Sequence, residues 1–150
     1  MTRSLAQRTA DAKAALAEGI DAWVATASRD GRAHLVPLSI AWHDGVVLAA
    51  TTSASATARN VAGTARARIG LGELRDVVML DADATARPWS SAPPTRTAAF
   101  VAARGWDPGG EEGDFVLVEL RPRRIQVWRT VEELEGRDVM RGGVWLAEDA

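Results

Sequence analysis

The stretch DAWVATASRDGRAHLVPLSIAWHDGVVLAATT, residues 21–52, decides the fold. It consists of three mostly apolar segments separated by two Asp-Gly pairs, Asp30-Gly31 and Asp44-Gly45. An Asp-Gly pair favours a tight hairpin turn because glycine adopts positive φ angles without a steric penalty. The stretch therefore predicts an antiparallel meander of three strands joined by short turns.

The middle segment alternates between two kinds of side chain. One face carries His34, Val36, Leu38, Ile40 and Trp42, and the other carries Ala33, Leu35, Pro37, Ser39 and Ala41. Alternation with a period of two is typical of a strand whose two faces have different surroundings. Because Pro37 has no backbone N–H, we expect a bulge or an unpaired strand edge there. The face of smaller residues either accepts a flat ring or is the less buried side of a barrel strand.

The rest of the chain adds short strands and helices. Helices are expected over residues 2–19, capped by Thr2 and ended by Gly19, over 53–63, capped by Ser53 or Ser55 and ended by Gly63, and over 95–104. Further strands are expected over residues 66–71, 76–86, 115–120 and 124–129. About six antiparallel strands with short flanking helices predict a mainly β (α+β) fold, closed or nearly closed into a barrel, because closure removes exposed strand edges.

Neither an internal repeat nor a linker interrupts the 150 residues, so one domain is expected. Its C-terminal tail, residues 131–150, is apolar enough to pack on the barrel or on a partner. The net charge of −2 argues against a nucleic-acid partner, and no apolar run approaches the roughly 20 residues that span a membrane. The absence of cysteine and of a signal-peptide pattern favours a cytoplasmic location.

The segment from Thr51 to Asn60 is the strongest candidate for a binding site. A strand ends in hydroxyl residues there, and a helix that carries Thr57, Arg59 and Asn60 follows. The N-terminus of a helix offers free amides and partial positive charge, which suits a phosphate. Residues 54–75 contain four arginines and one acid, which favours an anionic ligand. The same pattern is compatible with a capped surface helix whose arginine is solvated.

The chain has no hydrolase motif and too few imidazoles for a multi-histidine metal site, since His34 and His43 are its only histidines. Asp81 and Asp83 share a strand face, where two carboxylates are expected to be solvated. Five of the six tryptophans are expected mostly in the core. Trp106, in a polar loop, is the one expected to stack on a ligand or a partner.

The order of these elements resembles the pyridoxamine 5′-phosphate oxidase-like superfamily of flavin-binding split β-barrels. The resemblance extends from about residue 20 to residue 129, and residues 137–146 are similar to actinobacterial members. It is carried by the 23–31 hairpin, by His34-Leu35-Val36-Pro37-Leu38, and by the motif Thr51-Thr52-x-x-Ser55-x-Thr57-x-Arg59-Asn60-Val61. It implies a six-stranded antiparallel split barrel of Greek-key topology. The superfamily includes FMN-dependent and deazaflavin-dependent oxidoreductases.

The resemblance also implies a homodimer with the flavin at the interface. Val36, Pro37 and Leu38 would border the ring of the flavin. Thr51 and Thr52 would lie near its polar edge or its ribityl chain. The phosphate would be held by Ser55, Thr57, Arg59 and Asn60. Trp106 and the apolar tail are candidates for the wall that a second subunit completes. The oxidase members carry a basic pair where this chain has Ala56-Thr57, so Arg59 or a partner's arginine would have to compensate.

The sequence hypothesis is therefore an FMN-binding oxidoreductase that transfers hydride to or from a small organic substrate. Coenzyme F-420 is the alternative cofactor, since both molecules carry a phosphate on a ribityl-type chain. A flavin-binding or haem-binding protein without turnover is the alternative from another functional class, with His34 and His43 as the only imidazole ligands for haem.

Overall fold

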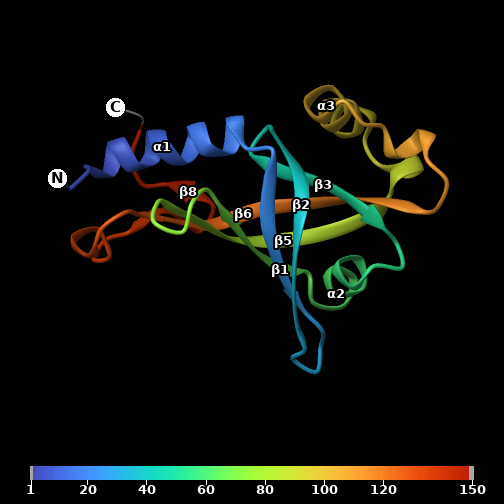
Figure 1. The fold of residues 1–150 in the computed structure, drawn as a ribbon, viewed down its shortest axis with the longest axis horizontal. Helices are drawn as coiled ribbons and strands as arrows, with labels where there is room; N and C mark the ends of the chain where they lie inside the picture. The colour runs from blue at the N-terminus through green and yellow to red at the C-terminus, as the bar shows by residue number, and fades with distance from the viewer. Residues whose placement is uncertain (1, 149–150) are drawn as a thin grey trace.

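The computed structural model describes residues 2–148. Its strands are β1 (Asp21–Ala27), β2 (Ala33–His43), β3 (Val46–Thr52), β4 (Arg66–Leu71), β5 (Val77–Pro88), β6 (Phe115–Trp128), β7 (Asp138–Arg141) and β8 (Val144–Trp145). Its α-helices are α1 (Leu5–Glu18), α2 (Ala56–Thr64) and α3 (Pro94–Arg104), and three short 3₁₀ turns cover Trp89–Ser91, Pro108–Gly110 and Val131–Glu133. Figure 1 shows α1 and α3 over different parts of the strands.

Six of the strands close into an antiparallel barrel. The order along the sheet is β3-β2-β1-β4-β5-β6, and β3 pairs back with β6. Strands β1 to β3 form the expected meander, and β4 returns to lie beside β1, which is the Greek-key arrangement. The expected six-stranded antiparallel barrel is confirmed. Strands β7 and β8 extend the sheet beyond β6.

Strand β3 is buried on both faces. Val47 and Ala49 belong to the core inside the barrel. Leu48 and Ala50 lie in a second apolar cluster with Phe100 of α3. The continuous apolar run of β3 therefore reflects a strand that is covered on both sides, as expected for such runs.

The barrel is split on one side of β2. Residues 33–39 of β2 pair with β1, whereas β3 pairs with β2 only at residues 40–43. Within residues 2–148, no strand pairs with the second edge of β2 from Ala33 to Ser39. Pro37 lies on this stretch, in regular register with Trp23 of β1. The expectation of an unpaired edge at Pro37 is confirmed, and there is no bulge.

The structure corrects three expected element boundaries. Ser4 rather than Thr2 caps α1, because Ser4 and Gln7 form a reciprocal capping box. Helix α2 continues through Gly63 to Thr64. Ala65 is its C-cap, with a φ of 56°, and the Ala65 carbonyl accepts a hydrogen bond from the Ala84 amide at 2.9 Å. The strands expected on either side of Pro122 form one strand, β6, whose pairing with β5 shifts register between Asp81 and Ala82.

An ion-pair cluster ties the N-terminal arm to the segment after β6. The Arg3 guanidinium donates to the Glu133 carboxylate at 2.7 Å, and the backbone amides of Arg3 and Arg129 donate to it at 2.9 and 2.8 Å. The Glu133 side chain is only 1% exposed. Its hydrogen bonds from Arg3, opposed by burial, lower the pKa of Glu133 to about 2.

We predict that Glu133→Gln lowers the free energy of unfolding at pH 7 by about 3–5 kcal/mol, because it breaks a buried ion pair. Because the pKa of Glu133 is depressed in the folded state, its contribution is present above the ordinary pKa of 4.5 and disappears as the pH falls toward about 2. Urea unfolding at several pH values measures this. The difference between the native protein and the variant should shrink over that range.

The control for this prediction is Glu135→Gln, which changes an exposed carboxylate two residues away. It should leave both the stability and its acid dependence unchanged. A constant difference between Glu133→Gln and the native protein from pH 7 to pH 3 would contradict the assignment.

Candidate functional site

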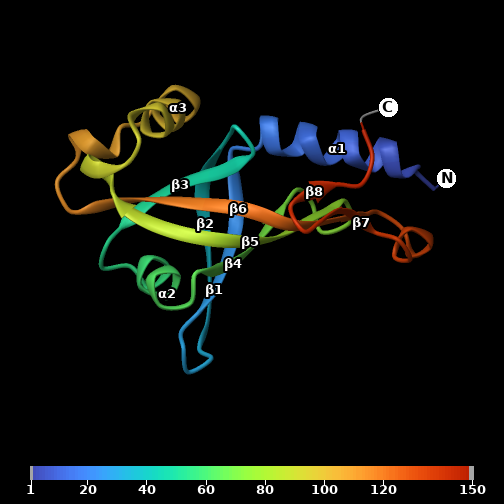
Figure 2. The ribbon, with the colours of Figure 1, turned by 180° about the vertical axis from the view of Figure 1, so that it is seen from behind.

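The β1–β2 hairpin and α2 enclose a cleft beside the split in the barrel. Both ribbon views show the hairpin projecting beyond the barrel with α2 next to it (Figure 2). The cleft has a volume of about 550 Å³. The polar side chains that line it include Arg29, Asp30, Arg32, His34, Arg59 and Asn60, and we call it the arginine cleft.

The hairpin turn that forms one wall is held by its own hydrogen bonds. The Arg32 amide donates to the Ser28 hydroxyl at 2.9 Å, and the Ser28 hydroxyl in turn donates to the Asp30 carboxylate. Gly31 has a φ of 87°, which an L side chain rarely adopts. The Arg29 Nε donates to the Gly63 carbonyl of α2 at 2.9 Å. The turn is therefore fixed both internally and against α2.

The cleft is electropositive. Three arginines and one aspartate line it, which gives a formal charge of +2 with His34 neutral. Arg29 is engaged with α2, but Arg32 and Arg59 make no side-chain hydrogen bond or ion pair with any residue from 2 to 148. Free guanidinium groups in a concave site are suited to a phosphate or a carboxylate.

The family model described as pyridoxamine 5′-phosphate oxidase matches residues 9–129. This chain belongs to the pyridoxamine 5′-phosphate oxidase-like family. The match covers α1 from residue 9 onward, all six barrel strands and the residues that line the arginine cleft, and it ends before β7 and β8. The family that the sequence resembles is therefore confirmed.

Solved structures share the fold of this family member. An F420 reductase superposes with a TM-score of 0.62 at 14% identity, over 75% of this chain and 94% of that one. A haem storage protein from Vibrio cholerae gives 0.64 at 16%, over 81% and 94%. A haem-binding protein from Mycobacterium smegmatis gives 0.68 at 19%, over 95% of this chain and 60% of that one. No curated protein sequence matches the chain significantly.

Two of the four residues expected at the phosphate lie in the arginine cleft of this family member, namely Arg59 and Asn60. Ser55 is the N-cap of α2, where its hydroxyl accepts from the Ala58 amide at 3.1 Å. Thr57 is 2% exposed and does not line the cleft. The Asn60 side-chain amide donates to the Thr26 hydroxyl at 3.1 Å and thereby links α2 to β1.

The residues expected around the ring lie on both sides of the split. Val36, Pro37 and Leu38 are on the free edge of β2, and Pro37 is exposed. Thr51 and Thr52 end β3, paired with Val116 and Phe115 of β6, and Thr52 is exposed. The split therefore brings the two groups to the same opening of the barrel.

Trp106 lies apart from the arginine cleft, in the aromatic cluster beside α3. Its ring packs edge-on against Phe100 and Phe115, with centroids 6.0 and 5.5 Å apart. Its indole N–H donates to Glu111 at 3.1 Å. Contact between Trp106 and a ligand stays a prediction.

Sequence reasoning did not select Arg29 and Arg32 as part of the site, and it named His34 only as a candidate haem ligand. The first two read as turn residues and the third as an isolated histidine. The signal that was available is the resemblance itself, because the Greek-key topology places the β1–β2 turn against α2. The excess of arginines over acids was counted for residues 54–75 only, so the two arginines of the hairpin were not included in it.

Two neighbouring residues of α2 should behave differently when replaced in the ligand-free protein. Asn60→Ala removes a hydrogen bond between α2 and β1, and should lower the free energy of unfolding by about 1 kcal/mol. Arg59→Ala removes an exposed side chain without a partner among residues 2–148, and should change it by less than about 0.5 kcal/mol. Urea unfolding of both variants measures the difference, and equal losses would make Arg59 a structural residue.

Proposed function

We propose that this chain is a flavin-dependent oxidoreductase that binds FMN, with the phosphate in the arginine cleft. The observation that carries the proposal is the pair of free guanidinium groups, Arg32 and Arg59, at the open side of the split barrel. When bound, a flavin supplies hydride transfer at its own ring, while the protein supplies binding, orientation and exclusion of water. This division of labour agrees with the absence of a hydrolytic motif in the sequence.

The residues around the cleft fit a phosphate attached to a flat ring. Arg32 and Arg59 approach from the hairpin and from α2, so that an anion between them would be held from two sides. Ala33 lines the cleft, and Leu35 and Pro37 follow it on the same face of β2. A molecule with its phosphate at the arginines would extend its ring toward this apolar face and the edge formed by Val36 and Leu38.

Coenzyme F-420 is the alternative cofactor for this site. It offers the same phosphate on a ribityl-type chain, so the arginine cleft suits both molecules. Titration of the purified protein with each coenzyme separates them. If neither binds, the proposed function is wrong.

We further propose that a second copy of the chain covers the ring. The outer face formed by β1, β2 and β4 exposes Trp23 by 53% and Leu35 by 59%, with Pro37 beside Trp23. Gly70 of β4 faces Trp23, which keeps this surface flat. An exposed apolar face next to a binding cleft is typical of a protein–protein interface. A homodimer would bury it and close the cofactor site at once.

We predict that Arg59→Ala weakens FMN binding about 10- to 100-fold, because a charge-assisted hydrogen bond contributes roughly 1.5–3 kcal/mol. Isothermal titration calorimetry of the native protein and the variant measures the effect. Riboflavin, which lacks the phosphate, should bind both proteins with the same affinity.

Arg75→Ala is the matched control, since Arg75 is also exposed but lies in the β4–β5 turn, away from the arginine cleft. It should leave the affinity for FMN unchanged. A similar loss in both arginine variants would argue for a general charge effect. Steady-state oxidation of a reduced nicotinamide or reduced deazaflavin, well above the amount of protein, separates an oxidoreductase from a flavin-binding module without turnover.

We predict that Leu35→Glu converts the dimer into a monomer, because it buries a charge in an apolar interface. Analytical ultracentrifugation measures the molecular mass in solution. The control Leu74→Glu changes a 95% exposed leucine in the β4–β5 turn and should leave the mass unchanged. A native protein that sediments as a monomer at all concentrations would contradict the proposed interface.

Haem binding is a second candidate function, favoured by the position of His34. This histidine is half-buried in the arginine cleft, where its imidazole would ligate iron and the arginines would pair with propionate groups. His43, at the end of β2, serves as the comparison. If haem binds through His34, then His34→Ala changes the absorption spectrum of the haem complex and His43→Ala does not. A spectrum that is unchanged when both are replaced would exclude histidine ligation.

A further inference from the structure

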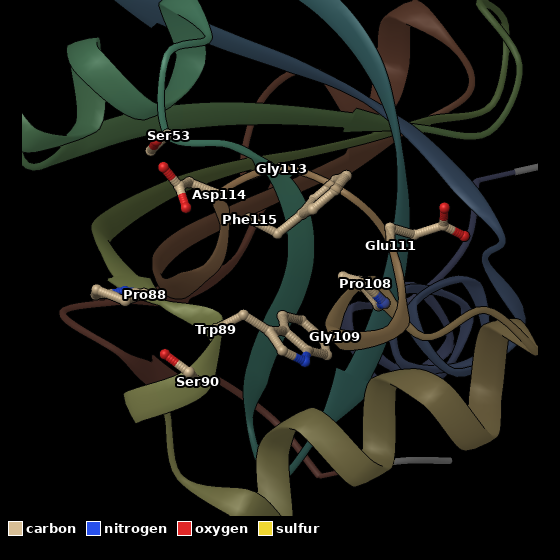
Figure 3. Close-up of a pocket in the computed structure, with 10 residues that line it drawn as sticks. All are labelled: Ser53, Pro88, Trp89, Ser90, Pro108, Gly109, Glu111, Gly113, Asp114 and Phe115. Atoms are coloured by element: carbon tan, nitrogen blue, oxygen red, sulfur yellow. The ribbon is translucent and has the colours of Figure 1, made fainter.

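A second cavity lies on the other side of the β3–α2 connection. Its volume is about 700 Å³, within the range of small-molecule sites. Trp89 and Phe115 both line this cavity, and Figure 3 shows Ser53 and Asp114 close together at one end of it. Ser53 lines this cavity, and Ala56 lines the arginine cleft. The cavity and the cleft have no lining residue in common.

The aromatic walls of this cavity are held from behind. Trp89 packs edge-on against Phe100, which is 0% exposed, with centroids 5.7 Å apart. Phe115 packs edge-on against Trp106 at 5.5 Å, and Trp106 also contacts Phe100. The two rings that face the cavity are therefore fixed by a continuous aromatic cluster, and a ligand would find them already in place.

The close approach of the 108–110 turn helps to position Trp89. A Cβ atom added to Gly109 would lie 3.1 Å from the Trp89 Nε1. This is tighter than most Cβ contacts, so a larger residue at this position would push the indole away. The glycine thus lets the loop lie against the indole without displacing it.

The charge of the cavity is negative. Glu111 and Asp114 are its charged lining residues, and no basic side chain lines it. Glu111 accepts a hydrogen bond from Trp106, whereas the Asp114 carboxylate has no partner among residues 2–148. The Asp114 backbone is fixed, because its carbonyl accepts from the Ser53 amide at 2.7 Å. The free carboxylate therefore stands on an ordered stretch of chain and lines the same cavity as the two aromatic rings.

We propose that this cavity binds a planar organic cation, an aromatic molecule that carries an ammonium or amidinium group. An aromatic ring would pack on Trp89 and Phe115, and the positive group would be attracted both by the indole face and by the Asp114 carboxylate. The lining residues of the two cavities carry opposite net charge, so the two cavities attract different ligands. The arginine cleft attracts anions, and this cavity repels them.

The proposed cation site does not depend on the proposed flavin function. A further step, that the bound cation is the substrate of the oxidoreductase, does rest on that function. Because Ser53 and Ala56 are three residues apart in the chain, a ligand here would lie on the far side of the same loop from the phosphate. A cationic substrate and an anionic cofactor would then occupy neighbouring sites without competing.

The test uses three probes of similar size: benzylamine, which is a cation at neutral pH, neutral benzyl alcohol and anionic benzoate. Binding to the full chain without added cofactor is measured from the shifts of the Trp89 indole resonance in ¹H–¹⁵N spectra. Benzylamine should shift this resonance at millimolar concentration, benzyl alcohol more weakly, and benzoate least. Equal shifts for all three probes, or no shift with benzylamine, would overturn the proposal.

The variant Asp114→Asn keeps the backbone hydrogen bond and removes the charge, and should weaken benzylamine binding about threefold. The matched control is Glu112→Gln, which neutralises an exposed carboxylate of the same loop that does not line the cavity. The control should bind benzylamine as the native protein does. Equal affinity in Asp114→Asn and the native protein, or equal loss in both variants, would overturn the proposal.

The variant Arg59→Ala distinguishes this inference from the proposed function. It should leave benzylamine binding unchanged, and Asp114→Asn should leave FMN binding unchanged. Loss of benzylamine binding in Arg59→Ala would show that the two cavities are not separate sites and would overturn the proposal. Failure of FMN to bind would remove the proposed function but leave the benzylamine result standing.

Discussion

The pairing of β3 with two different strands is the constraint on which the structure depends. β3 pairs with β2 at Val46–Ala49 and with β6 at Val47–Thr52. The second pairing closes the barrel. Because β3 stays beside β2 only as far as Ala49, the first half of β2 is left with a free edge. Closure and the split are two consequences of the same strand path. Burial of both faces of β3, inside the barrel and under α3, holds that path in place.

Two cavities of opposite charge lie near the end of this strand. The loop that follows β3 has the arginine cleft on one side and the aromatic–acidic cavity on the other. The positive side is built from the hairpin turn and α2, and the negative side from the loop that precedes β6. Neither cavity is formed by one element alone, so the ligand preference of each is a property of the assembled barrel. The ion-pair cluster at Glu133, which ties the N-terminal arm to the segment after β6, lies outside both cavities.

Much of the fold was predictable because its signals are local. The two Asp-Gly turns and the apolar segments between them correspond to β1, β2 and β3 within a residue or so. Helix boundaries were less accurate, since Ser4 competes with Thr2 as a cap and Ala65 takes the left-handed position expected of Gly63. Of the residues predicted for the phosphate, Arg59 and Asn60 line the arginine cleft, whereas Thr57 is buried and Ser55 caps the helix.

The sequence by itself determined the succession of strands along the chain and the turns, and it predicted a positively charged helix at Arg59. Periodicity, turn chemistry and residue type act over a few neighbouring positions, so they can be read without knowing what lies across the sheet. Only the tertiary structure decided that Arg29 and Arg32 join Arg59, that Asn60 bonds to Thr26, and that Asp114 lines the same cavity as Trp89. These contacts depend on the register and closure of the barrel, which bring together segments that are distant in the chain.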